Sequence, residues 1–497
     1  MLIHDYLDQQ IEYEKKYGTN TLVLMQVGSF FEFYGVDNDQ EKIGNAKIIA
    51  EILNIQLTRR NKAILENSRN NCLMAGFPTH SLKRFIQILL SHQYTIVLIE
   101  QVTPPPNPKR DITQIFSPGT YIEEVTNYNP NNIVSLYLNH EICFKTNKNI
   151  YLFGLATIDL STGKNYLYEA KINYYDKNAY FEEIYRFIET FNPKEIIINY
   201  SGHFEDSTND ILNELNQKIN LQNRLVHYKK IDVQFENIHY QNKFLSNIFK
   251  YDSFLNPLEF LDLEKRKMST ISYIILLDFA FEHNENSIQK IDKPQFWNYD
   301  DHLILYHNAL YQLNIVSLNN QENHKYKSLF HVIDKTSTSL GKRFLKYCIH
   351  NPLTNSDLIQ KRYSLIEEFI NIKGIEKSEK LLDEIIDIER IHRKISLGQL
   401  HPFEFLNLSY TYLNIQKLID IFINVLDLED YYFNEELICD FENYIVGFED
   451  MLNLQEMGKY NLQNIQSSFF KKGVYQELDD LQQKIDNVYS YFHETMK

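Results

Sequence analysis

The sequence lacks the residue patterns of the common metal, redox and nucleotide sites. Its four cysteines are far apart and form no CxxC pair, which favours reduced thiols over a zinc site or a disulfide framework (Cys72, Cys143, Cys348 and Cys439). No Gly-x-x-x-x-Gly-Lys-Ser/Thr segment is present, so no phosphate-binding loop is predicted. HExxH and Ser-His-Asp patterns are also absent, and the sixteen histidines are scattered. We therefore expect no catalytic residue, no metal site and no cofactor in this chain.

Long apolar runs are absent as well. No stretch reaches 18 consecutive apolar residues, so no transmembrane helix is predicted. Residues 1–10 carry acids and no basic leader, which argues against a signal peptide. We expect an intracellular protein, in a cytoplasm, nucleoid, organelle or viral factory, that is not secreted.

The charge balance argues against a generic nucleic-acid binder but not against a local one. The 497 residues indicate several domains, and the net charge of −16 is unfavourable for phosphate contacts. Residues 42–110, however, hold ten bases against three acids, a local excess of +7. Such a basic island is the electrostatic footprint of a DNA-facing surface, or simply a solvated patch. The bases are Lys42, Lys47, Arg59, Arg60, Lys62, Arg69, Lys83, Arg84, Lys109 and Arg110, and the acids are Glu51, Glu66 and Glu100.

Residues 22–34 (LVLMQVGSFFEFY) are the stretch around which the chain is organised. An apolar strand ends at Gly28, which allows a turn, and two aromatics and a carboxylate follow. At least one of Phe30 and Phe31 should point away from the core, because neighbouring side chains of an extended segment face opposite sides. Residue types alone favour core packing of all the aromatics. The sharper alternative is a stacking Phe30 beside Glu32, presented on a loop to a nucleic acid base.

This stretch resembles the mismatch-recognition segment of the MutS family of DNA mismatch repair proteins, whose pattern is Gly, any residue, Phe, aromatic, Glu. Residues 28–32 match it in order, although Ser29 replaces the Asp common in bacterial members. Residues 57–60, 74–80, 100–101 and 118–120 resemble further first-domain segments, most closely in the branch of large DNA viruses and coral mitochondria. The resemblance implies that Phe30 stacks on a mispaired base and Glu32 hydrogen-bonds to it. It also implies a DNA-backbone set of Arg59, Arg60, Met74, Lys109 and Arg110, in which the bases hold phosphates and Met74 packs against the groove or supports the loop.

The resemblance implies a multi-domain α/β plus all-α protein. A mixed α/β mismatch-recognition domain is expected at 1–122, an RNase H-like connector at 133–236, a helical core (lever) domain at 237–470, and the start of the lever helix leading to a clamp at 471–497. Asp159, before a turn, is read as turn chemistry rather than a nuclease carboxylate. Residues 74–80 are expected to form a turn around Gly76, and Thr336 or Ser337 to cap a helix of the core domain.

The expected function is recognition of mispaired or unpaired bases in duplex DNA, with kinking of the DNA. Family members carry an ATPase domain after the clamp, and we interpret the chain as the portion before it. ATP and Mg²⁺ are therefore expected only in that further domain, and this chain is not expected to be an ATPase itself. Expected partners are double-stranded DNA with mispairs or small loops, a second copy in the full-length form, and a downstream repair factor, without a membrane. The alternatives are a scaffold relative without mismatch sensing and, less favoured, a metal-dependent nuclease.

Overall fold

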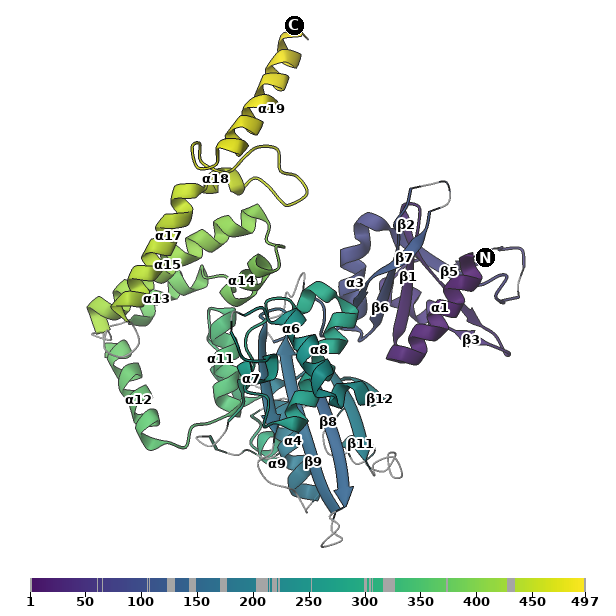
Figure 1. Ribbon diagram of the computed structural model, residues 1–497, viewed down its shortest axis with the longest axis horizontal. Coiled ribbons are helices and arrows are strands. Elements are labelled where there is room, and N and C mark those ends of the chain that lie inside the picture. Colours follow the sequence, from purple (N-terminus) through teal and green to yellow (C-terminus); the bar gives the residue numbers. More distant parts are fainter. Residues whose placement is uncertain are drawn as a thin grey trace. The chain divides into compact units, whose positions relative to one another are not determined.

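The computed structural model divides the chain into two compact units, residues 1–298 and 299–497, hereafter unit 1 and unit 2 (Figure 1). The structure describes residues 2–495 apart from 60, 65, 105, 107, 123–129, 143–148, 170–176, 203–212, 214, 217–220, 222–223, 252, 299–301, 304, 306, 316–326, 372–373 and 427–433. Cys143 and Arg60 thus lie outside the described residues. Among the helices that are described, none is long and apolar enough to cross a membrane.

Unit 1 begins with a mixed sheet whose strand order is β4-β5-β2-β1-β6-β7, with β3 paired to β2. The hairpin partners β1 and β2 lie at its centre, and β6 runs parallel to β1. Helix α1 packs on β1, and its Tyr6 and Leu7 are fully buried. The elements are α1 (Leu2–Tyr17), β1 (Thr21–Val27), β2 (Phe30–Asp37), β3 (Lys42–Ile43), α2 (Ala46–Leu53), β4 (Thr58–Arg59), β5 (Leu73–Pro78), the 3-10 turn η1 (Thr79–Ser81), α3 (Leu82–Ser91), β6 (Thr95–Gln101) and β7 (Arg110–Phe116).

A second sheet follows in the order β12-β11-β8-β9-β10-β13. Its first three strands, β8 to β10, pair antiparallel, whereas β11 runs parallel to both β8 and β12. Asp159 ends β9 and accepts hydrogen bonds from the backbone and hydroxyl of Ser161, which is the turn chemistry expected of it. The elements are β8 (Asn132–Ile142), β9 (Asn149–Asp159), β10 (Lys164–Glu169), α4 (Lys177–Phe191), β11 (Glu195–Gly202), β12 (Leu225–Lys230) and β13 (Gln295–Phe296).

Helix α8 (Lys267–His283) completes unit 1 by packing on β8 and β9. At the start of α8 the backbone approaches so closely that a Cβ on Gly154 would lie 2.0 Å from the carbonyl oxygen of Met268. Helices predominate from residue 238 onward. The compact unit nevertheless extends to residue 298, because α8 packs on the second sheet. The other helices here are η4 (Val233–Glu236), α6 (Ile238–Ile248), α7 (Pro257–Phe260) and η5 (Glu285–Ile288).

Unit 2 is helical throughout its described part. Tyr412 of α15 and Phe448 of α17 meet in a small apolar core, with ring centroids 5.9 Å apart. The long helix α19, yellow in Figure 1, carries the stripe Leu481, Ile485 and Val488, which is exposed. The helices are α9 (His307–Gln312), α10 (Leu329–Ile333), α11 (Ser339–His350), α12 (Ser356–Asn371), α13 (Gly374–Asp383), α14 (Ile388–Ser396), α15 (Pro402–Leu426), α17 (Glu435–Met451), α18 (Leu454–Met457) and α19 (Gln476–Thr495).

Candidate nucleic-acid interface

The stretch around Gly28 is a tight hairpin between β1 and β2. Val27 pairs with Phe30, so only Gly28 and Ser29 form the loop, and Gly28 has φ +63°. A glycine with positive φ at the first loop position is what a two-residue hairpin turn of type II′ requires. The carbonyl of Ser29 accepts a hydrogen bond of 2.9 Å from the backbone N–H of Thr79, which ties the loop to the end of β5. The expectation of an aromatic loop was wrong, because Phe30 is already the first residue of β2.

The strand conformation separates the two adjacent phenylalanines. Phe31 is 2% exposed and lies in the core, with its ring 6.3 Å from that of Phe77. Phe30 is 45% exposed, and no aromatic ring of the described residues packs on it. The prediction that one of the two would point away from the core is therefore confirmed. A large apolar side chain held at a hairpin tip by a rigid sheet is poised to contact another body.

Strand β5 lies beside β2 and shapes the surface next to Phe30. Glu32 pairs with Gly76 and Tyr34 with Met74, so Met74 lies on the face of the sheet that carries Glu32. A Cβ on Gly76 would lie 2.7 Å from the carbonyl oxygen of Phe31 and 3.1 Å from Cγ of Glu32. The expected turn over residues 74–80 was thus wrong. Gly76 stands inside a strand, where it allows the close approach of β2 rather than a change of direction.

Glu32 is half-buried, and one of its carboxylate oxygens is engaged. The hydroxyl of Tyr34 donates to Oε2 of Glu32 at 2.5 Å. Within the described part of the chain this is its only hydrogen bond, so Oε1 has no protein donor. Phe30, Glu32 and Tyr34 alternate with buried Phe31 and Phe33 along β2, which places the first three on one face. The exposed ring of Phe30 and the carboxylate of Glu32 therefore lie next to each other at the hairpin.

Arg110 and Lys109 lie at the start of β7, close to the end of β1. The guanidinium Nε of Arg110 donates to the carbonyl of Gln26 at 2.9 Å, two residues before Gly28. The amide side chain of Gln101 donates to the same carbonyl at 3.3 Å, and the side-chain oxygen of Gln26 accepts from the backbone N–H of Gln101. Lys109 is exposed and lies 3.1 Å from Asp111. The structure thus brings Arg110 to the base of the hairpin and leaves Lys109 accessible beside it.

The remaining bases of the island are not equivalent. Arg59 pairs with Leu73 across β4 and β5, on the face opposite to that of Met74 and Glu32. Its guanidinium lies 3.5 Å from the carbonyl oxygen of Ile64. Arg69 forms ion pairs with Glu41, which directly precedes residues 42–110, and with Asp8 of α1. The electrostatic excess of this surface is therefore smaller than +7 because acids distant in sequence neutralise part of it.

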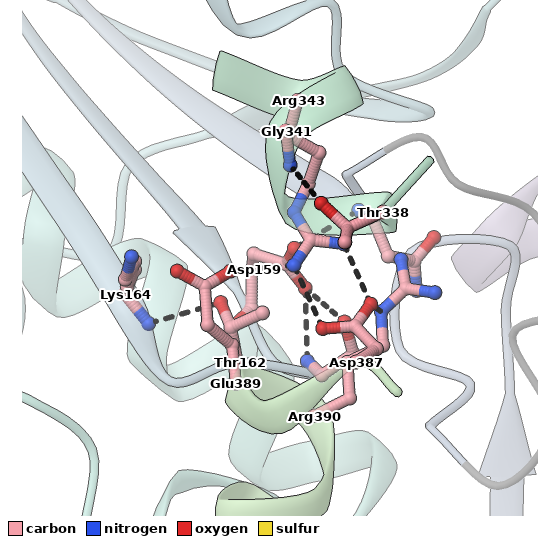
Figure 2. A network of polar contacts seen from close by, with 11 residues as sticks. Asp159, Thr162, Lys164, Thr338, Gly341, Arg343, Asp387, Glu389 and Arg390 are labelled. Carbon is pink, nitrogen blue, oxygen red and sulfur yellow. Dashed lines mark hydrogen bonds and ion pairs between the residues drawn. The ribbon is translucent and has the colours of Figure 1, made fainter. Parts of the chain in front are cut away.

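A polar network in unit 2 joins α11 to the start of α14. The guanidinium of Arg343 donates to both oxygens of Asp387 at 2.7 and 2.8 Å and to Glu389 at 2.5 Å, as Figure 2 shows. Burial opposes the charge on Arg343, but these bonds outweigh burial and raise its pKa. Thr338, not Thr336 or Ser337, caps α11 by accepting from the backbone N–H of Gly341. The network thus ties α11 to α14 within unit 2.

Two residues of the interface escaped the sequence reasoning. Tyr34 was treated only as an aromatic of the segment, although its spacing of two from Glu32 places both on one face once the segment is a strand. Gln26 was treated as part of an apolar run, yet its carbonyl and side chain join β1 to Gln101 and Arg110. The polar residue inside an apolar strand was the available signal for Gln26.

Comparison with known families matches two parts of the chain. Residues 7–125 match the model described as MutS domain I, and residues 308–489 match MutS domain III. Phe30, Glu32 and Gln26 all lie within the first match, and the Arg343 network lies within the second.

Individual relatives agree with these family matches. A DNA mismatch repair protein mutS homolog of Acanthamoeba polyphaga mimivirus is 32% identical over 99% of this chain and 45% of its own length. The DNA mismatch repair proteins MutS of Halothermothrix orenii and Caldanaerobacter subterraneus subsp. tengcongensis are 26% and 27% identical, over 82% and 85% of this chain. These comparisons cover 42% and 44% of the two bacterial proteins, so the chain spans less than half the length of the relatives it matches. The two domain matches and the relatives together show that this chain belongs to the MutS family.

Proposed function

We propose that this chain recognises mispaired or unpaired bases in duplex DNA and thereby serves DNA mismatch repair. The observation that carries the proposal is a pair of side chains at the hairpin. Phe30 is exposed and has no ring partner among the described residues, and Glu32 beside it has one carboxylate oxygen to which none of those residues donates. Membership of the MutS family, whose relatives are named mismatch repair proteins, points to the same function.

The physical mechanism follows from the two side chains. Phe30 enters the base stack as an apolar wedge and kinks the duplex toward the major groove. Unstacking costs a few kcal/mol and costs least where pairing is already weak, so a mispair is the favoured point of entry. Glu32 then accepts a hydrogen bond from the displaced base. Selectivity comes from deformability of the site more than from reading of its sequence.

Basic residues around the hairpin position the DNA in this proposal. Lys109 is exposed and Arg110 lies at the base of the hairpin, where both can reach phosphates. Arg59 lies on the other face of the sheet, so its side chain would have to reach around the edge strand β4 to contact a phosphate. Met74, on the face of Glu32, would support the groove contact.

The finer domain roles are also part of the proposal. The second sheet, with three antiparallel strands followed by parallel ones, supports the RNase H-like connector, and Asp159 there serves a turn rather than cleavage. Family members act as dimers and use ATP through a domain beyond the clamp. We propose the same arrangement for the full-length protein, with this chain contributing recognition and not ATP hydrolysis.

Competitive DNA binding at fixed salt tests the proposal. A duplex with one G·T mispair competes against the matched duplex for the wild type, for Phe30→Ala, and for Ile48→Ala, which removes an apolar side chain of similar exposure on α2. We expect Phe30→Ala to reduce the mispair preference about tenfold or more, because base–aromatic stacking is lost, and to keep salt-sensitive background binding. Ile48→Ala should change neither quantity.

The scaffold alternative makes the opposite prediction. A wild type that binds both duplexes equally, with no effect of Phe30→Ala, would identify a relative without mismatch sensing.

A further inference from the structure

Tyr34 is the residue that fixes the geometry of Glu32. The two side chains are two positions apart on β2 and therefore lie on the same face of the sheet. The Tyr34 hydroxyl donates to Oε2 of Glu32 at 2.5 Å, which leaves Oε1 as the free acceptor. Hydrogen bonds to a charged acceptor are stronger and more directional than those between neutral groups.

The ring of Tyr34 is itself held in place. It is 4% exposed, and the ring of Tyr6 meets it edge to face at 4.9 Å. Tyr6 is anchored in turn, because its hydroxyl donates to the carbonyl of Val23 on β1 at 2.8 Å. Burial raises the pKa of Tyr34 far above its ordinary value, and the neighbouring carboxylate of Glu32 raises it further, so the phenol stays a neutral donor. The hydroxyl that donates to Glu32 therefore belongs to a buried and neutral phenol.

The opposite side of Glu32 is closed by the neighbouring strand. Gly76 stands directly across from it on β5, and a Cβ there would lie 3.1 Å from Cγ of Glu32. The carboxylate stem therefore lies between Gly76 and the phenol of Tyr34. Such confinement lowers the entropy lost when the side chain binds a partner.

We propose that Tyr34 is a positioning residue for Glu32, holding one carboxylate oxygen so that the other meets the displaced base, and that it thereby favours base edges that offer an N–H donor. The inference rests on the proposed function of the hairpin and adds a preference among mispairs to it.

The preference follows from donor and acceptor chemistry. An ionised carboxylate only accepts hydrogen bonds, and with the phenol hydrogen on Oε2 the other oxygen is the one left open to a base. It is therefore satisfied by a base N–H, such as N3–H of thymine or N1–H of guanine, when mispairing releases that group. A base edge that presents only a ring nitrogen or a carbonyl oxygen leaves two acceptors facing each other, which costs binding free energy.

Two unpaired bases that stack alike but differ in this one donor provide the probe. Competing duplexes carry a single unpaired thymine or a single unpaired N3-methylthymine, which lacks the N3–H. Their affinity ratio is measured for the wild type, Tyr34→Phe, Glu32→Ala and the double variant. Tyr94→Phe is the matched control, because it removes the hydroxyl of another buried tyrosine of unit 1, which lies just before β6 and not on β2.

We expect Tyr34→Phe to lower the thymine preference about fivefold while the affinity for matched duplex stays unchanged. In the Glu32→Ala background the same substitution should have no further effect, since Tyr34 acts through the carboxylate. Tyr94→Phe should keep the wild-type ratio.

The inference is overturned if Tyr34→Phe keeps the wild-type ratio, or if it lowers the ratio equally with and without Glu32. Failure of the proposed function looks different. In that case the wild type prefers neither bulged duplex over matched DNA and Phe30→Ala changes nothing, and the role of Tyr34 falls with it.

Discussion

The two compact units use different forces to hold their elements together. Unit 1 has a continuous apolar core that includes both sheets and the buried length of α8. In unit 2 the described core is small, with four buried residues where α15 meets α17. Only nine of the buried apolar residues in the described part of the chain belong to unit 2: Leu305, Leu310, Ile315, Leu408, Tyr412, Leu418, Ile445, Phe448 and Met457.

Ion pairs join several of the helices of unit 2. Arg343 joins α11 to Asp387 and Glu389, and Lys394 of α14 lies 2.6 Å from Glu404 of α15. Large side chains on its surface stay exposed, among them Phe344 of α11 and Tyr363 of α12. The hairpin of unit 1 therefore lies on a sheet with a large buried core. The helices of unit 2 have a smaller core, and removal of a charge from their ion pairs should loosen them.

The largest expected effect is the loss of a core aromatic in unit 1. Phe31→Ala should lower the free energy of unfolding of the first sheet by about 3–5 kcal/mol, because it leaves a cavity beside Phe77. Phe344→Ala, which truncates an aromatic that is 64% exposed in unit 2, should cost less than about 0.5 kcal/mol. Amide hydrogen exchange of β1, β2 and α11 gives both values. Equal costs at the two positions would refute the contrast between the units.

A pH effect should separate the units next. His283 at the end of α8 is fully buried, and its Nδ1–H donates to the carbonyl of Phe279 at 2.8 Å. Burial lowers the pKa of His283 to about 4, although the carboxylate of Glu195 opposes the shift. Between about pH 6.5 and 4 the unfolded chain therefore binds a proton that the folded chain does not. The free energy of unfolding of unit 1 should fall by on the order of 3 kcal/mol as the pH falls through this window.

The Arg343 network of unit 2 should respond only in stronger acid. Burial would raise the pKa of Asp387, but the guanidinium of Arg343 holds it below its ordinary value. The stabilisation that ionised Asp387 contributes to unit 2 is therefore present above about pH 4 and is lost as the pH falls further. Urea titrations at pH 7, 5.5, 4 and about 2.5, followed by the single Trp297 of unit 1 and by exchange of the α11 amides, measure the two windows. His283→Gln should abolish the first window, and persistence of that window in the variant would exclude His283 as its source.

Removal of one cation should loosen unit 2 alone. Arg343→Met leaves Asp387 and Glu389 without the guanidinium and should cost about 2 kcal/mol in the local unfolding of α11 and α14. The triple variant that also carries Asp387→Asn and Glu389→Gln should recover part of this loss, because the two side chains that lost the guanidinium no longer carry a negative charge. Hydrogen exchange of both helices measures the effect, and the protection of β1 and β2 should not change. A loss that also reaches the first sheet would contradict the separation of the two units.

Local features of the hairpin could be predicted from the sequence, while distant pairings could not. The period of two in an extended segment separated Phe30 from Phe31, and Gly28 supplied the turn. The bond from Tyr34 to Glu32 escaped because the segment was treated as a loop, for which that period has no meaning. The pairing of Arg69 with Asp8 joins residues 61 positions apart, so a count of charges within a window overestimated the basic surface.

The smallest expected effect compares two exposed lysines that each have an acidic neighbour. Lys109 of unit 1 lies 3.1 Å from Asp111, and Lys459 of unit 2 pairs with Glu456. Exposed pairs contribute little to folding, so Lys109→Ala and Lys459→Ala should both leave the unfolding transition unchanged. If Lys109 holds a phosphate beside the hairpin, only its removal should reduce the slope of log affinity against log salt concentration, by about 1. Asp111→Asn should strengthen binding of matched duplex, because it releases Lys109 from its acidic neighbour. Equal slopes for both lysine variants would place the DNA backbone elsewhere on the first sheet and remove Lys109 from the interface.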